Sequence, residues 1–140
     1  MRRIEDVAVL DKISRELYKA SNGKIIPSLD EEYENCWSFV ARSAGWIPSA
    51  RWLQPDVMNK LLLEHTVTVP MQQAKLGDIL AYYGTGEGYY VRGELIHTAF
   101  VIQRGLQILH KRGTYPVSLE GYTDEPAYLP ADLRTLRILD

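Results

Sequence analysis

The sequence predicts an α+β domain in which N-terminal helices pack on an antiparallel β-sheet. Helical periodicity dominates the first half of the chain, and apolar runs separated by turn residues dominate the second half. The two kinds of segment do not alternate strictly, which favours an antiparallel sheet over a parallel one. The 140 residues contain no internal repeat, low-complexity tract or long linker, so we expect residues 1–140 to form one domain.

Helices are expected in three places. They span residues 4–20, 36–44 and 55–65. Asn22 and Gly23 end the first helix, because both accept the left-handed conformation of a C-cap. Asn35 is a favourable N-cap for the second helix, and Gly45 follows its last turn. Pro55 stands in the first turn of the third helix, where a missing N–H costs nothing.

Strands are expected from residue 67 onward. They span residues 67–69, 78–83, 95–103, 106–111 and 133–139. A glycine-rich loop over residues 84–88 follows the second of them, and we expect it to lie beside a cleft. Arg104 and Gly105 form the turn between the third and fourth strands. Residues 113–132, which contain three prolines, predict an irregular wrap over the sheet, to which the sequence assigns no function.

Composition excludes several classes of function. The formal net charge is −2, from 16 basic and 18 acidic residues, so no excess of positive charge favours a nucleic acid or an anionic lipid surface as partner. The single cysteine forms no intramolecular disulfide and excludes a cysteine-rich zinc site. We expect no metal and no cofactor.

The N-terminus predicts neither a signal peptide nor a membrane anchor. Arg2 and Arg3 resemble the charged start of a signal peptide, but charged residues interrupt the segment where its apolar region would lie. No stretch approaches the roughly 20 apolar residues of a membrane-spanning helix. We therefore expect a soluble protein, while its location and oligomeric state stay open.

Cys36 is the first candidate for chemistry. It is expected in the first turn of the helix over residues 36–44, where unpaired N–H groups and the helix dipole favour a negative charge. A thiol at such a position tends to have a lowered pKa, and its thiolate is the nucleophilic form. The same N–H groups are placed to stabilise the oxyanion of an acyl-transfer intermediate.

Two histidines are expected on one face of the sheet. If a two-residue turn joins Gln103 to Leu106, counting back places His110 opposite Ala99, and Ala99 shares its face with His97. The histidines are then diagonal neighbours, about 7–8 Å apart at the backbone, so one imidazole can orient the other. A four-residue loop keeps them on one face, whereas a loop of odd length separates them.

Each of these residues also has an ordinary structural interpretation. A lone cysteine is most often a small buried apolar residue. A histidine within a strand is most often a hydrogen-bonded interior group or a surface residue. What favours a catalytic site is the combination of a cysteine at a helix start with two histidines on one strand face.

Four segments, in this order, resemble the NlpC-type and CHAP-type cysteine peptidases and amidases, also called thiol proteases. NCWSFV at residues 35–40 is similar to their nucleophile helix, and residues 69–82 contain the Gly-Asp pair that precedes their first core strand. Residues 95–102 resemble their histidine strand. Residues 106–111 resemble the following strand, which holds the third polar residue of the site in NlpC-type members.

This resemblance implies a papain-like core and a hydrolase of amide bonds. It implies Cys36 as nucleophile, His97 as base and His110 as the third member, with a peptide or peptidoglycan as substrate. Many NlpC-type enzymes have Asp-Cys-Ser-Gly at the nucleophile, where this chain has Asn-Cys-Trp-Ser. That difference bears on the substrate more than on the chemistry.

Further residues are expected around the site. The four candidates for oxyanion or substrate binding are Asn35, Trp37, Tyr33 and Tyr82. Asp78 is expected to be structural, in the turn before its strand, and His65 to be a helix-end residue without a catalytic role.

Two other functions remain open. The same fold and cysteine would serve a toxin or effector that deamidates or acylates a protein target. The domain would alternatively be a non-catalytic binding module that keeps the scaffold. The presence of Cys36, His97 and His110 together counts against the second possibility.

Overall fold

The computed structural model describes residues 4–27, 34–103, 107–113 and 115–139. Its helices are α1 (Ile4–Ala20), α2 (Cys36–Ser43) and α3 (Pro55–His65). Its strands are β1 (Thr66–Val69), β2 (Ile79–Gly84), β3 (Leu95–Gln103), β4 (Gln107–His110), β5 (Ser118–Gly121) and β6 (Ala131–Ile138). Two 3-10 turns, η1 (Met71–Gln73) and η2 (Pro126–Tyr128), complete the described elements.

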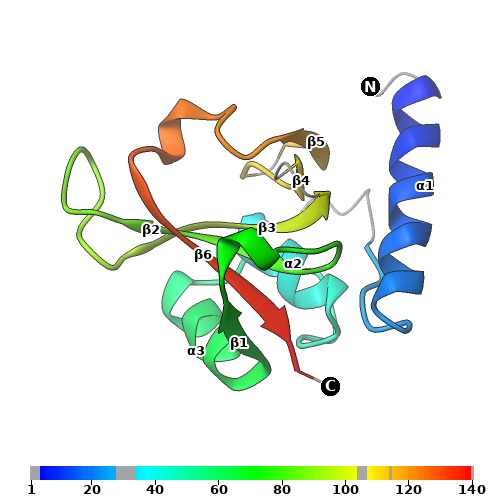
Figure 1. The fold of residues 1–140 in the computed structure, drawn as a ribbon, viewed down its shortest axis with the longest axis horizontal. Coiled ribbons are helices and arrows are strands. Elements are labelled where there is room, and N and C mark those ends of the chain that lie inside the picture. Colours follow the sequence, from blue (N-terminus) through cyan, green and yellow to red (C-terminus); the bar gives the residue numbers. More distant parts are fainter. Residues whose placement is uncertain (1–3, 28–33, 104–106, 114, 140) are drawn as a thin grey trace.

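All six strands join one sheet in the order β1-β6-β2-β3-β4-β5, and every neighbouring pair is antiparallel. Helices α2 and α3 lie together on one side of this sheet, and α1 stands beside its β4–β5 end (Figure 1). The predicted α+β class with an antiparallel sheet is therefore confirmed.

The central strands are buried on both faces. Along β2, alternate residues Ile79, Ala81 and Tyr83 join the core that faces the helices, whereas Leu80 and Tyr82 join a second apolar cluster on the opposite face. This is why the sequence of β2 is continuously apolar and does not alternate. The side chains of β2 and of β3 as far as Ile102 therefore point into one of two dry layers.

The β3–β4 register was predicted correctly, although the pairing of Gln103 with Leu106 was not, and the predicted Arg104–Gly105 turn lies outside the described residues. Gln103 pairs with Gln107, so three residues separate the paired ends where a two-residue turn was expected. A bulge between Val101 and Gln103 compensates, and Val101 then pairs with Ile108. That pairing is the register that places both histidines on one face.

The interpretation of residues 113–132 as wholly irregular was wrong. Residues 118–121 form β5, which pairs with β4, and residues 126–128 form η2. The last strand also begins at Ala131, two residues before the predicted start. Only four half-buried residues make up β5, which is too short for a period to stand out in the sequence.

Gly84 is required where β2 passes into the long connection to β3. Its N–H donates to the carbonyl of Glu94 and its own carbonyl accepts from Gly93, both at 2.8 Å. A Cβ at this position would lie 2.1 Å from the Val91 carbonyl oxygen. Only glycine permits this close approach of the two backbones, which fixes how the connection leaves the sheet.

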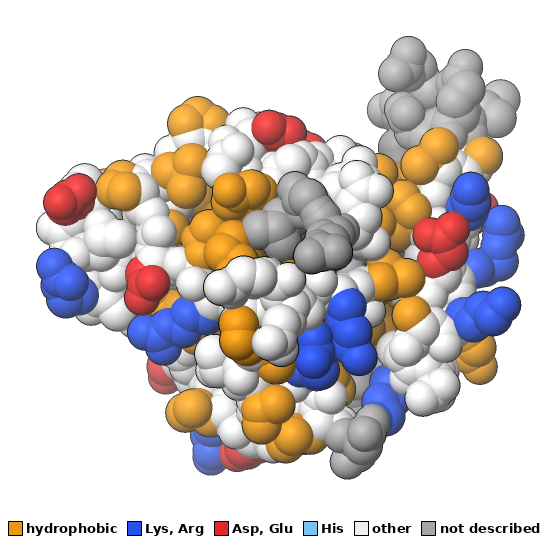
Figure 2. All heavy atoms as spheres, in the orientation of Figure 1, with side chains coloured by type: hydrophobic (Ala, Val, Ile, Leu, Met, Phe, Trp, Pro, Cys, Tyr) orange, Lys and Arg blue, Asp and Glu red, His pale blue; other side chains and the backbone are white. Residues whose placement is uncertain are grey.

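The described surface gives no sign of a membrane span or of a one-sign field. Within the described residues, no helix combines the length and the apolar character needed to cross a bilayer. Acidic and basic side chains both occur across the face in Figure 2, with several Lys and Arg along α1.

Candidate active site

The start of α2 is fixed by a reciprocal cap. The Ser38 N–H donates to Asn35 Oδ1 at 2.9 Å, and the Asn35 N–H donates to Ser38 Oγ at 2.8 Å. The Asn35 amide also donates to the carbonyl of Leu53 at 2.7 Å, which joins the cap to the segment before α3. The oxygen and the NH₂ of the Asn35 side chain are thus both engaged, and Cys36 is held as the first residue of the helix.

A buried ion pair anchors the residue before this cap. The Glu34 side chain has no solvent exposure. It accepts two hydrogen bonds from the guanidinium of Arg42, which lies in the last turn of α2. A two-point Arg–carboxylate contact fixes direction as well as distance. The chain therefore enters α2 along one path.

Cys36 contacts β3 through Thr98. Thr98, the next residue after His97, donates from Oγ1 to the Cys36 carbonyl at 3.1 Å. The cysteine is 7% exposed, and burial raises the pKa of its thiol from the usual 9.0 to about 12. The backbone N–H groups of Thr98, Cys36 and Trp37 act in the opposite direction and favour the thiolate.

The expected lowering of the thiol pKa is therefore wrong for this conformation. The helix-start N–H groups do favour the anion, as predicted, but the loss of solvent around Cys36 outweighs them. The local sequence predicts that Cys36 lies at a helix start. Its solvent access depends on which distant segments pack around it in the folded chain.

His97 and His110 are joined as the register predicts. Nε2 of His97 lies 2.7 Å from Nδ1 of His110, and both rings are almost fully buried. Burial lowers the pKa of His97 well below its usual 6.5, and the nearby His110 and Arg112 act in the same direction. Burial also lowers the pKa of His110, although Glu120 partly offsets it. Both imidazoles are thus neutral at pH 7.

Glu120, which sequence analysis missed, lies on the outer side of His110. Its Oε2 is 3.4 Å from His110 Nε2, a charge contact that is long for a hydrogen bond. Its Oε1 is 3.0 Å from the guanidinium of Arg112, which also pairs with Glu125. The His110–Ser118 pairing of β4 with β5 brings Glu120 here, so no local sequence signal marks it.

Two tyrosines enclose the His97 ring. The Tyr128 ring stacks on it with centroids 4.0 Å apart and planes at 13°. Tyr82 meets it edge-on at 5.3 Å, and the Tyr82 hydroxyl donates to the carbonyl of Tyr122 at 2.6 Å. Burial raises the pKa of Tyr128, and the charge of Cys36 acts in the same direction.

Two nitrogens of the pair, His97 Nδ1 and His110 Nε2, are buried and left without a hydrogen-bond partner within the described residues. The other nitrogen of His97 is committed to His110, so Nδ1 is the atom of His97 able to exchange a proton with a neighbour. The structure thus joins His97 to His110 by a direct contact, and it joins Cys36 to the same strand through Thr98.

Comparison with protein-family models, curated proteins and solved structures found no match for this chain.

The remaining predicted residues lie in different settings. Tyr33 lies outside the described residues. Asn35 caps α2, Tyr82 is buried behind His97, and Trp37 is half-buried with its Nε1 buried and unpaired. A substrate-binding role for these residues stays a prediction.

Two residues were expected to lie outside the chemistry. Asp78 accepts from the Lys75 N–H in the turn before β2 and pairs with Arg137. His65 ends α3 and stacks on Trp46. Across the ranges that the structure describes, no group of three or more His, Cys, Asp or Glu side chains is arranged to hold a metal ion.

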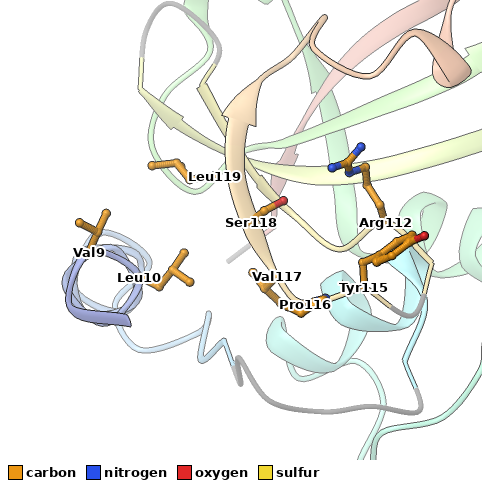
Figure 3. A pocket seen from close by; sticks show the side chains of 8 residues that line it. All are labelled: Val9, Leu10, Arg112, Tyr115, Pro116, Val117, Ser118 and Leu119. Carbon is orange, nitrogen blue, oxygen red and sulfur yellow. The ribbon is translucent and has the colours of Figure 1, made fainter. Parts of the chain in front are cut away.

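A hollow of about 450 Å³ lies elsewhere, between α1 and β5 (Figure 3). Leu10 of α1 faces Val117 across it, and Arg112 lies at its far side. Arg112 is already paired with two carboxylates, and the Ser118 hydroxyl donates to Glu120. The hollow contains no nucleophile beside a base, so the candidate site is assigned to Cys36 and the histidines.

Proposed function

We propose that this protein is a cysteine hydrolase that cleaves amide bonds through an acyl-enzyme on Cys36. The observation that carries the proposal is the 2.7 Å contact of His97 with His110 on the strand whose Thr98 contacts the helix-start Cys36, with His97 Nδ1 left unpaired. A buried polar nitrogen without a partner is costly, and a catalytic role accounts for keeping it.

In the proposed reaction, His97 Nδ1 takes the proton of the Cys36 thiol. The thiolate sulfur attacks the carbonyl carbon of the amide, and the carbonyl electrons move to the oxygen. The C–N bond then breaks, and the amine leaves with the proton that His97 holds. Water, deprotonated by His97, attacks the thioester, releases the acid and restores the thiol.

The backbone at the start of α2 supplies the oxyanion contacts in this proposal. The N–H groups of Cys36 and Trp37 favour a negative charge at the thiol, and the same donors are suited to the tetrahedral intermediate. The helix-start cysteine, the antiparallel sheet and the adjacent histidine strands support a papain-like, NlpC-type core. By this resemblance, the substrate class is a peptide or the stem peptides of peptidoglycan.

Digestion of purified peptidoglycan by the wild type and by Cys36→Ala tests the proposal. We expect new muropeptide masses with the wild type and none with the variant. His65→Ala, a histidine at the end of α3, is the matched control and should retain activity. Undiminished turnover by Cys36→Ala would refute the assignment of the nucleophile.

The experiment would have a different outcome if a protein target is deamidated or acylated and peptidoglycan stays intact. The acyl-transfer chemistry of Cys36 would then stand, but the substrate would be a protein. Such an outcome assigns the domain to the toxin or effector alternative, whose nucleophile is the same Cys36.

A non-catalytic binding module is the second candidate, and one observation favours it. The Cys36 thiol is 7% exposed and its pKa is raised to about 12, so the resting protein holds it protonated and covered. If Cys36 reacts with no amide and with no thiol reagent, even in the Tyr128→Ala variant, this second candidate replaces the first.

A further inference from the structure

The Glu120 carboxylate is held in one orientation. Its Oε1 lies 3.0 Å from Arg112 and accepts from the Ser118 hydroxyl at 3.2 Å, which leaves Oε2 toward His110 at 3.4 Å. Arg112 is itself held by Glu125. The side chain of Glu120 is only about 20% exposed, so its contact with the buried ring is weakly screened.

This orientation determines where the protons of both imidazoles lie. The 3.4 Å contact is not a hydrogen bond, and His110 Nε2 makes none within the described residues. A carboxylate nevertheless attracts an N–H and repels a lone pair, so neutral His110 keeps its proton on Nε2 and its Nδ1 is an acceptor. The 2.7 Å contact between His110 Nδ1 and His97 Nε2 consequently requires His97 to donate. Neutral His97 then has its lone pair on Nδ1, the atom that makes no hydrogen bond.

We propose that Glu120 is a positioning residue that sets the tautomers of His110 and His97, so that the lone pair of His97 is presented at Nδ1. The last step, in which that lone pair takes the thiol proton, rests on the proposed function; the tautomer assignment does not. The titratable and charged groups around the two rings are Cys36 of α2, Tyr82 of β2, Glu120 of β5, and Arg112, Glu125 and Tyr128 of the connecting segments.

Two-bond ¹H–¹⁵N correlation spectra of the ¹⁵N-histidine-labelled protein at pH 7 test the assignment directly. In the wild type we expect a proton on Nε2 and none on Nδ1 for both His97 and His110. His65, at the end of α3, is an internal reference whose resonances should not respond to changes at β5. A wild-type His110 protonated on Nδ1 overturns the proposal.

Glu120→Ala should move His110 to a mixture of tautomers, and His97 should follow. Glu64→Ala is the matched control, because Glu64 is an exposed carboxylate on α3, and its His97 and His110 signals should stay as in the wild type. If Glu120→Ala does not fold, Glu120→Gln takes its place, and a mixture is again expected because either its oxygen or its NH₂ can face His110. Unchanged tautomers in the folded variant overturn the proposal.

Turnover separates this proposal from the proposed function. General-base catalysis contributes roughly 10²–10⁴-fold to a reaction rate. A wrong tautomer of His97 in Glu120→Ala should therefore lower amide turnover by about tenfold or more. Tautomers that shift as expected in a protein without amide turnover leave the positioning role standing and remove the hydrolase. Amide turnover in a protein whose histidine tautomers do not change in Glu120→Ala would support the hydrolase and overturn the positioning role of Glu120.

Discussion

Two neutral imidazoles and a protonated thiol lie together in the interior, and each is held in its uncharged form by the loss of solvent. For His97 and His110 burial lowers the pKa, and for Cys36 burial raises it. A thiolate–imidazolium pair is thus disfavoured in this conformation. Proton transfer from sulfur to His97 depends on a change in solvation when a substrate enters.

The buried histidines predict that the protein is sensitive to acid. Unfolded histidines bind protons below about pH 6.5, whereas His97 in the folded protein stays neutral to a much lower pH. The free energy of unfolding should therefore be constant above pH 6.5 and fall as the pH drops, by up to about 1.4 kcal/mol per pH unit for each such group. Urea unfolding at pH 7 and pH 5 measures it.

His97→Gln should reduce that loss, because glutamine has no charge to gain on unfolding. An identical difference between pH 7 and pH 5 in the wild type and in this variant would contradict the assignment of a neutral buried His97.

At the scale of elements, α2 holds Cys36 at its start and the turn η2 places Tyr128 on the His97 ring. Helix α2 begins where the Asn35–Ser38 cap sets it. The Glu125 side chain accepts from the Ala127 N–H and caps η2, and the Arg112 pair ties η2 to the strand that carries His110. The cap thus sets the position of Cys36, whereas η2, a distant segment of the chain, sets the surroundings of His97.

Asn35→Ala should lower the free energy of unfolding by about 1 kcal/mol, as for other N-cap residues, with a further loss because the Leu53 carbonyl is left without its donor. Chemical denaturation measures this effect. Gln54→Ala is the matched control, since Gln54 is the N-cap of α3 and makes no side-chain capping bond. Equal losses in the two variants would show that the Asn35 cap has no special role.

Tyr128→Ala should expose the thiol. Removal of the stacked ring returns solvent to Cys36 and lowers its pKa from about 12, so we expect the rate of alkylation by iodoacetamide at pH 8 to rise at least about tenfold, the factor for one pKa unit. Tyr89→Ala, which removes a side chain that is 93% exposed, should leave the rate unchanged. Equal rates in wild type and Tyr128→Ala would exclude Tyr128 as the cover.

At the scale of the whole molecule, the sheet joins two dry layers through shared strands. Phe100 packs edge-on against Phe39 of α2 on the helix side, while its neighbours Ala99 and Val101 pack with Ile108 on the other. Neither layer can be lost without exposing the second face of β2 and β3. The two layers should therefore unfold together.

We expect one cooperative unfolding transition, as is usual for domains below about 150 residues. Near-UV circular dichroism, which reports aromatic packing, and far-UV circular dichroism, which reports the helices and strands, should have coincident midpoints in urea. Separated midpoints would mean that the helix layer comes away from a sheet that persists alone.

The sequence by itself determined α2, its Asn35 cap and the β3 and β4 strands, because caps and strand alternation depend on residues that are close in the chain. The shared face of the two histidines also needed the bulge between Val101 and Gln103, which the sequence did not indicate. The sequence also did not indicate β5, Glu120 or the stacking of Tyr128 on His97, and it gave the wrong direction for the thiol pKa. Those features depend on which distant segments meet and how much water they exclude. Only the tertiary structure decides that, because desolvation is a property of the assembled surroundings and not of the residue that experiences it.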